Sequence, residues 1–149
     1  MPVTLSATKI LENLISFPTI SCDTNLPLVD WVEEYFNGHG ITCHRHYNEV
    51  GDKAAIMAHV GPNVEGGIIL SGHTDVVPVE GQEWHSDPFT LTEKSGRLYG
   101  RGTCDMKGFN SLAIAALVQA KNLRLKRPIQ LALSFDEEIG CTGAPPMIA

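Results

Sequence analysis

Residues 67–75 read Gly67-Ile68-Ile69-Leu70-Ser71-Gly72-His73-Thr74-Asp75, an apolar run followed at once by ionisable side chains. A continuous apolar run this short is typical of a strand buried on both faces, as in a parallel sheet. A second run of the same kind, at residues 129–135, is followed directly by Asp136-Glu137-Glu138. We therefore expect two buried strands whose ends carry the chemistry of the molecule.

Helical and extended patterns alternate around these two runs. Apolar residues at helical spacing predict helices over residues 7–17 and 26–37, and an Ala-rich apolar stretch predicts a buried helix over 112–125. Strand patterns occupy residues 41–47 and 53–60, and a Ser95-Gly96 turn predicts a small hairpin within 89–99. This alternation predicts an α/β fold with a mostly parallel sheet flanked by helices.

The composition is that of an ordinary globular protein. The 149 residues are 43% hydrophobic and 19% charged, which excludes a disordered chain. A net charge of −6 argues against nucleic acid as a partner, and we expect the basic residues near 121–127 to lie at a helix end.

No apolar stretch is long enough to span a bilayer, and the N-terminus lacks a signal-peptide pattern, so we expect no membrane contact and a cytoplasmic location. The 4 cysteines are scattered, which predicts reduced thiols.

The ends of the two buried strands are expected to meet. In open α/β sheets, ligands bind beyond the carboxyl ends of the strands. His73 would lie there with Glu137 and Glu138, and the segment at 100–108 adds Asp105 just before the predicted helix. One imidazole with several carboxylates and no paired thiols suits zinc, cobalt or manganese. A carboxylate can bridge two metal ions, a neighbouring acid can serve as general base, and Asp75 can hold the second ring nitrogen of His73.

Each of these residues also has an ordinary structural interpretation. Alone, His73 is more often a hydrogen-bonded residue at a strand end, and Asp105 is a good helix N-cap. The acidic run after residue 135 is, by itself, more often a solvated corner. Their coincidence at corresponding strand ends of one sheet favours a site.

Several segments together resemble the co-catalytic zinc exopeptidase and deacylase family. They are Ser-Gly-His-Thr-Asp-Val-Val-Pro at residues 71–78, Trp-His-Ser-Asp-Pro-Phe at 84–89, Tyr-Gly-Arg-Gly-Thr-Cys-Asp-Met-Lys-Gly at 99–108 and Asp-Glu-Glu at 136–138. The resemblance implies two divalent metal ions, zinc or cobalt, with His73 on one, Glu138 on the other and Asp105 bridging both. It also implies that Glu137 is the general base and that Asp75 orients His73.

The same resemblance implies a cis peptide bond after Asp105 and metal-assisted hydrolysis of an amide. Residues 133–144 look most like the branch that removes the acetyl group from N-acetylornithine, a step of arginine biosynthesis. Desuccinylation of a diamino acid, aminoacylase activity and dipeptide hydrolysis are the alternatives. The resemblance further implies a homodimer for the full-length protein.

Members of that family are considerably longer than 149 residues. The apolar ending at residues 145–149 is typical of a helix cut just after it begins. We therefore expect residues 1–149 to be the N-terminal part of the metallohydrolase catalytic domain, without the lid and dimerisation domain. Such a chain would have an incomplete ligand shell and be inactive alone. The alternative from another class is a non-catalytic chain that assembles with a partner through an exposed sheet edge.

Overall fold

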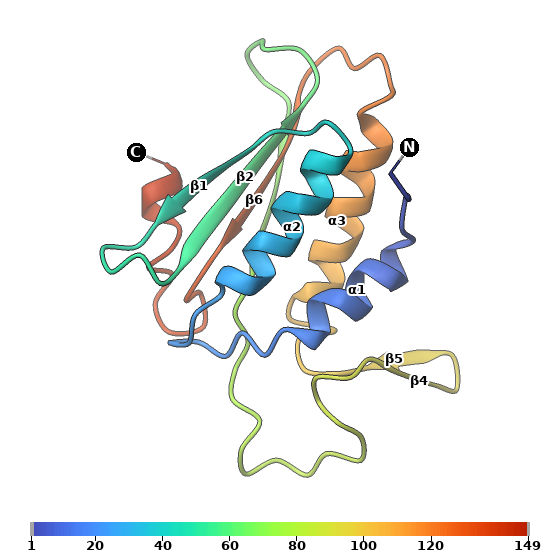
Figure 1. Cartoon of the computed structure of the whole chain (residues 1–149), viewed down its shortest axis with the longest axis vertical. Helices are drawn as coiled ribbons and strands as arrows, with labels where there is room; N and C mark the ends of the chain where they lie inside the picture. The colour runs from blue at the N-terminus through green and yellow to red at the C-terminus, as the bar shows by residue number, and fades with distance from the viewer. Residues whose placement is uncertain (1, 149) are drawn as a thin grey trace.

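The computed structural model describes residues 2–148 and shows a twisted sheet with helices packed against it (Figure 1). The elements in chain order are α1 (Ala7–Ser16), α2 (Leu26–Gly38), β1 (Cys43–Tyr47), β2 (Ala54–Val60), β3 (Ile68–His73), β4 (Thr92–Lys94), β5 (Arg97–Tyr99), α3 (Lys107–Ala120), β6 (Ile129–Ser134) and the 3-10 turn η1 (Pro145–Met147). The expected α/β class is confirmed. The predicted hairpin is confirmed as β4 and β5, and the expected helix at 145–149 is only this 3-10 turn, with residue 149 outside the described residues.

The sheet is mixed, and the expectation of a mostly parallel sheet is wrong. Its strand order is β1-β2-β6-β3, and only the β3–β6 pair is parallel. A short turn joins β1 to β2, so the chain returns antiparallel beside itself. The connection from β3 to β6 instead passes through α3, which is long enough for a parallel crossover.

Strand β3 lies at an edge of the sheet. The prediction that it is buried on both faces is also wrong, because its first residues are exposed. Within the described residues it pairs with β6 alone. Ile68 is 56% exposed and Ile69 is 57% exposed, whereas Gly72 and His73 at the end of the strand are buried. The burial of this strand is therefore concentrated where it approaches the candidate site.

The core lies between the sheet and one layer of helices. In Figure 1, α2 and α3 lie side by side across the sheet and α1 packs against α3. Alternate residues of β2 and β6 meet the apolar stripes of the helices, and the largest buried side chains of this core include Phe36, Ile56, Ile114, Leu131 and Leu133. The expected N-cap of α1 is present, because the Ser6 hydroxyl accepts a hydrogen bond from the Lys9 backbone at 3.2 Å.

Helix α3 begins five residues before its predicted start and ends at Ala120. Its first turn carries Lys107, Asn110 and Ser111, which are polar and yet buried. An apolar pattern cannot detect such a turn, because tertiary partners rather than water satisfy its polar groups. Met106 occupies the N-cap position, so Asp105 is not the cap. Lys121 is the C-cap, so the basic residues near 121–127 begin at the end of the helix, as expected.

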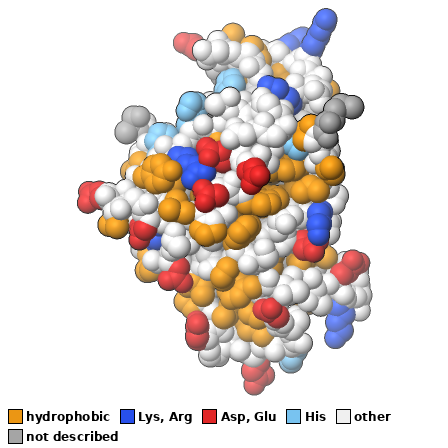
Figure 2. Space-filling model, in the orientation of Figure 1, with side chains coloured by type: hydrophobic (Ala, Val, Ile, Leu, Met, Phe, Trp, Pro, Cys, Tyr) orange, Lys and Arg blue, Asp and Glu red, His pale blue; other side chains and the backbone are white. Residues whose placement is uncertain are grey.

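The visible surface carries interspersed acidic, basic and apolar side chains (Figure 2). One ion-pair group joins β1 to α2, where Arg45 contacts Asp30 at 2.7 Å and also contacts Glu33. None of the helices in the described part of the chain is long and apolar enough to cross a membrane.

Candidate metal centre

The parallel pair β3 and β6 brings two ionisable segments to one edge of the sheet. His73 ends β3 and lies opposite Ser134, which ends β6. The chain after β6 then turns sharply at Asp136, whose φ is +53°, before it reaches Glu137 and Glu138. The expected meeting of the two strand ends is therefore present in the fold.

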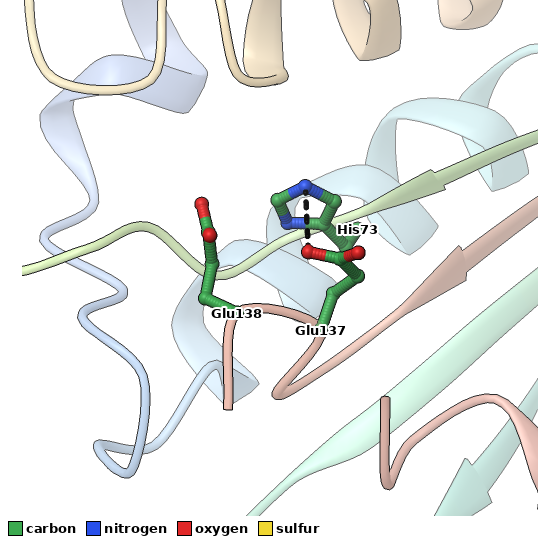
Figure 3. Close-up of side chains that lie close together, drawn as sticks. All are labelled: His73, Glu137 and Glu138. Atoms are coloured by element: carbon green, nitrogen blue, oxygen red, sulfur yellow. Dashed lines mark ion pairs between the residues drawn. The ribbon is translucent and has the colours of Figure 1, made fainter. Parts of the chain in front are cut away.

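His73, Glu137 and Glu138 form a compact group of possible metal ligands (Figure 3). Each residue offers one ligand atom, and these atoms all lie within 4.8 Å of one another. The His73 Nε2 atom is 3.6 Å from the nearer Glu137 carboxylate oxygen. The His73 side chain is 5% exposed and that of Glu137 is 44% exposed, so the histidine is buried while the glutamate is accessible to water.

Asp105 reaches the same histidine from the turn that precedes α3. Its carboxylate oxygen lies 3.0 Å from His73 Nε2, and its side chain is largely exposed. The Asp105-Met106 peptide bond is cis, which confirms that expectation. Asp105 contacts His73 but is not one of the three residues whose ligand atoms are mutually close. The candidate metal centre is defined here as His73, Asp105, Glu137 and Glu138.

Asp75 lies behind the histidine and ties it to the acidic turn. The His73 Nδ1 atom is 3.0 Å from the Asp75 backbone oxygen and 3.3 Å from its carboxylate. The same carboxylate accepts hydrogen bonds from the Ser21 hydroxyl at 2.6 Å and from the backbone N–H groups of Glu137 and Glu138 at 3.0 and 3.3 Å. These contacts leave Nε2 of His73 as the ring nitrogen directed at the open side of the site.

The site gathers negative charge around one imidazole. Burial acts to lower the pKa of His73, but the hydrogen bond and charge of Asp75, helped by Asp105 and Glu137, outweigh it and raise this pKa to about 9. Burial acts to raise the pKa of Asp75, yet its hydrogen bonds lower it to about 2. Burial and the nearby charge of Asp105 raise the pKa of Glu138. One imidazole nitrogen and several carboxylates that repel one another fit a divalent cation such as zinc, cobalt or manganese.

Sequence reasoning missed several polar residues that hold this site. Asn110 donates from its side chain to the His73 backbone oxygen at 2.7 Å. The fully buried Lys107 ammonium donates to the backbone oxygens of Leu14 and Phe17 at 2.9 and 2.7 Å, which joins the start of α3 to the end of α1. Burial lowers the pKa of Lys107 to about 7, although the charge of Asp75 acts in the opposite direction. The sequence signal for Asn110 is only a polar side chain at the edge of an apolar helix, whereas Lys107 also lies within the resembling segment at 99–108.

Residues 69–149 match Peptidase family M20/M25/M40. This match covers more than half of the chain. The chain belongs to this family. The resemblance seen in the sequence is thereby confirmed at the level of a metallohydrolase family.

Curated relatives in the M20/M25/M40 family include acetylornithine deacetylases. The chain is 37% identical over 142 residues to that of Buchnera aphidicola subsp. Schizaphis graminum (strain Sg), which covers 91% of this chain and 37% of the relative. It is 45% identical over 97 residues to that of Pasteurella multocida (strain Pm70), which covers 65% of this chain and 25% of the relative. The chain thus spans about a third or less of the length of these relatives.

Two solved structures show the same fold. Human carnosine dipeptidase 1 superimposes with a TM-score of 0.74 at 23% identity, covering 95% of this chain and 34% of that one. The M20 family metallo-carboxypeptidase Sso-CP2 from Sulfolobus solfataricus gives a TM-score of 0.74 at 24% identity, covering 91% of this chain and 32% of that one. At these identities the likeness is one of fold.

Proposed function

We propose that this chain carries metal-binding and proton-transferring residues of an amide hydrolase that removes the acetyl group from N-acetylornithine. The observation that carries the proposal is the convergence of His73, Glu137 and Glu138 at the ends of two parallel strands. The likeness to two acetylornithine deacetylases supports the choice of substrate. We place this reaction in arginine biosynthesis in the cytoplasm, with the full-length enzyme acting as a homodimer.

In this proposal, His73 would hold one ion of a zinc or cobalt pair, Glu138 would hold the other, and Asp105 would be a ligand to both. A bound ion of this kind lowers the pKa of water and polarises the amide carbonyl. Each ion would then have two protein ligands, one of them shared, which is fewer than the three protein ligands that a catalytic zinc ion ordinarily has. We therefore propose that the chain of 149 residues binds metal weakly and is inactive alone.

Glu137 serves as general base in the proposed mechanism. Its side chain is 44% exposed and accessible to water, while its backbone N–H donates to the Asp75 carboxylate. The carboxylate accepts a proton from the attacking water and then delivers it to the amine nitrogen as the C–N bond breaks. Asp75 keeps Nδ1 of His73 occupied, so that Nε2 would be the nitrogen that binds a metal ion. The products are acetate and ornithine.

Titration of the chain with Zn²⁺ and Co²⁺ tests the metal centre. We expect weak binding that falls at least about 10-fold on His73→Ala or Asp105→Ala, since loss of a ligand costs at least as much as loss of a ligand's partner. Asp23→Asn serves as the matched control, because Asp23 is exposed and lies outside the candidate metal centre. Equal binding by the parent and both alanine variants would contradict the proposal.

Acetate release tests the proposed inactivity and, where the chain proves active, the choice of substrate. We expect none from N-acetylornithine with the chain alone in the presence of zinc or cobalt. Release that disappears on Glu137→Ala would overturn the inactivity while supporting the activity itself. Faster hydrolysis of an N-succinyl diamino acid or a dipeptide under the same conditions would overturn the choice of substrate.

A second candidate function is favoured by the exposed edge of β3. Ile68 and Ile69 are more than half exposed on a strand that, among the described residues, pairs on one side only. Such edges recruit other chains. Under this alternative the chain is a non-catalytic partner in an assembly, and size-exclusion chromatography would show an oligomer that Ile69→Lys returns to a monomer.

A further inference from the structure

A buried ion pair lies behind the turn that carries Glu137 and Glu138. The Lys53 ammonium donates to both carboxylate oxygens of Asp136, at 2.6 and 2.7 Å. The two side chains are 6% and 13% exposed, so water has little access to the pair. Lys53 immediately precedes β2, and Asp136 immediately precedes Glu137, so the pair connects two distant parts of the chain.

Asp136 holds the backbone in a conformation that reverses the chain. Its φ of +53° lies in the left-handed region, which among non-glycine residues is entered mostly by Asn and Asp. The Cys22 backbone N–H donates a third hydrogen bond to the Asp136 carboxylate, at 3.2 Å. Figure 3 shows Glu137 and Glu138 on the turn that follows, with the Glu137 carboxylate against the His73 ring and the Glu138 side chain extending beside it. The direction of the two carboxylates therefore depends on how this residue is held.

The turn is fastened on two sides. On one side, the Asp75 carboxylate accepts the backbone N–H groups of Glu137 and Glu138. On the other side, Lys53 holds Asp136. Asp75 also contacts His73, whereas among the described residues the Lys53 side chain reaches the site through Asp136. Lys53 is thus well placed to act on the acidic turn without touching a proposed ligand.

We propose that Lys53 is a positioning residue, which through its ion pair with Asp136 fixes the turn that presents Glu137 and Glu138 to the metal. The proposal deepens the proposed function, because the presented side chains are the proposed base and one proposed ligand. The fixing of the turn is a property of the metal-free chain, so it is measurable whether or not metal binds.

The test uses a double variant, Lys53→Met together with Asp136→Asn. Removing only one partner would leave an unpaired charge buried, which strongly destabilises a protein. Methionine keeps the apolar stem of the lysine, and asparagine tolerates the positive φ of position 136. Amide hydrogen exchange, followed by NMR in the metal-free chain, then reports local opening residue by residue.

We expect the backbone amides of Glu137 and Glu138 to exchange at least about 10-fold faster in the double variant. The amides in the ladder between β2 and β6 should change less than about twofold, because that ladder does not depend on the ion pair. Arg45→Met is the matched control: it removes the ion-pair group between β1 and α2 and should leave both turn amides unchanged. Unchanged exchange at Glu137 and Glu138 in the double variant would overturn the proposal. Acceleration of the ladder in step with the turn would overturn it as well, because the pair would then stabilise only the fold.

Zn²⁺ titration of the same variants separates this proposal from the proposed function. The double variant should bind Zn²⁺ about 10- to 100-fold more weakly than the parent, the usual cost of losing residues that orient ligands. Unaltered Zn²⁺ binding in the double variant would overturn the positioning role. A parent chain with no Zn²⁺ binding would contradict the proposed metal centre, while hydrogen exchange would still decide the role of Lys53.

Discussion

Replacing Asp75 with asparagine would remove one negative charge behind His73 while keeping the shape of the side chain. The Asp75 carboxylate is 3% exposed and accepts hydrogen bonds from the Ser21 hydroxyl and from the backbone of Glu137 and Glu138. An asparagine side chain has one acceptor oxygen and one NH₂ donor. One oxygen cannot serve donors on both sides of the group, so at least one backbone N–H would lose its partner.

The pKa of Asp75 sets the expected magnitude. Although burial opposes it, the hydrogen bonds lower this pKa from the ordinary 3.8 to about 2. Because the folded pKa lies below the unfolded one, the charged form contributes about 2.5 kcal/mol of stability at neutral pH. This contribution is fully present well above pH 3.8, falls to about half near pH 3 and is lost as the pH falls through about 2. Asparagine keeps part of the hydrogen bonding, so we expect Asp75→Asn to cost about 2 kcal/mol at pH 7.

Urea unfolding of the metal-free chain in EDTA measures this cost. With a denaturant slope of about 1–3 kcal/mol/M, the midpoint should fall by roughly 1 M at pH 7. Asp23→Asn is the matched control: Asp23 is exposed, and its replacement should change stability by less than about 0.5 kcal/mol. A cost below about 0.5 kcal/mol for Asp75→Asn, or an equal cost at pH 3 and pH 7, would refute the reasoning.

Three further outcomes are expected. Gly72→Ala should lower the free energy of unfolding, measured by thermal unfolding, by about 1–3 kcal/mol, because the new Cβ would lie 2.2 Å from the buried Asn110 side-chain oxygen. Gly38→Ala is the control: its Cβ meets nothing nearer than 3.9 Å, so it should not destabilise the chain. In NMR titrations of the metal-free chain, the His73 ring should titrate near pH 9. Asp75→Asn should lower this pKa, because the carboxylate that stabilises the charged ring is then gone. An unchanged pKa would contradict the role given to Asp75. Burial raises the pKa of Cys43 to about 12, whereas the other three cysteines are exposed. Iodoacetamide at neutral pH should therefore label three thiols in the native chain, and Cys43 only after unfolding.

The elements whose predictions are confirmed are those that sequence patterns over a few neighbouring residues specify. α1 and α2 each carry an apolar stripe at helical spacing, and α1 also has its serine N-cap. The β4 and β5 hairpin follows from the Ser95-Gly96 turn, where both residues have positive φ. Such features depend on residues a few positions apart, so a single sequence is enough to find them.

The predictions that are wrong concern features of the fold that contacts between distant residues decide. The apolar run in β3 indicated a strand but not that it lies at an edge, with Ile68 and Ile69 exposed. The apolar pattern does not predict the first turn of α3, because Lys107 is buried against the backbone oxygens of Leu14 and Phe17 at the end of α1. The antiparallel pairing of β2 with β6 also joins segments far apart in the chain, and no pattern within either strand specifies its direction.

The sequence by itself placed an imidazole and several carboxylates directly after apolar strands, within the residues that match one metallohydrolase family. Only the tertiary structure decided how those side chains are held. The bonds from Glu137 and Glu138 to Asp75 span 62 and 63 residues, and the bond from Lys53 to Asp136 spans 83. The physical reason is that residue type and periodicity are local properties of a chain, whereas burial, pairing and the partner of each polar group are set by contacts that exist only after folding.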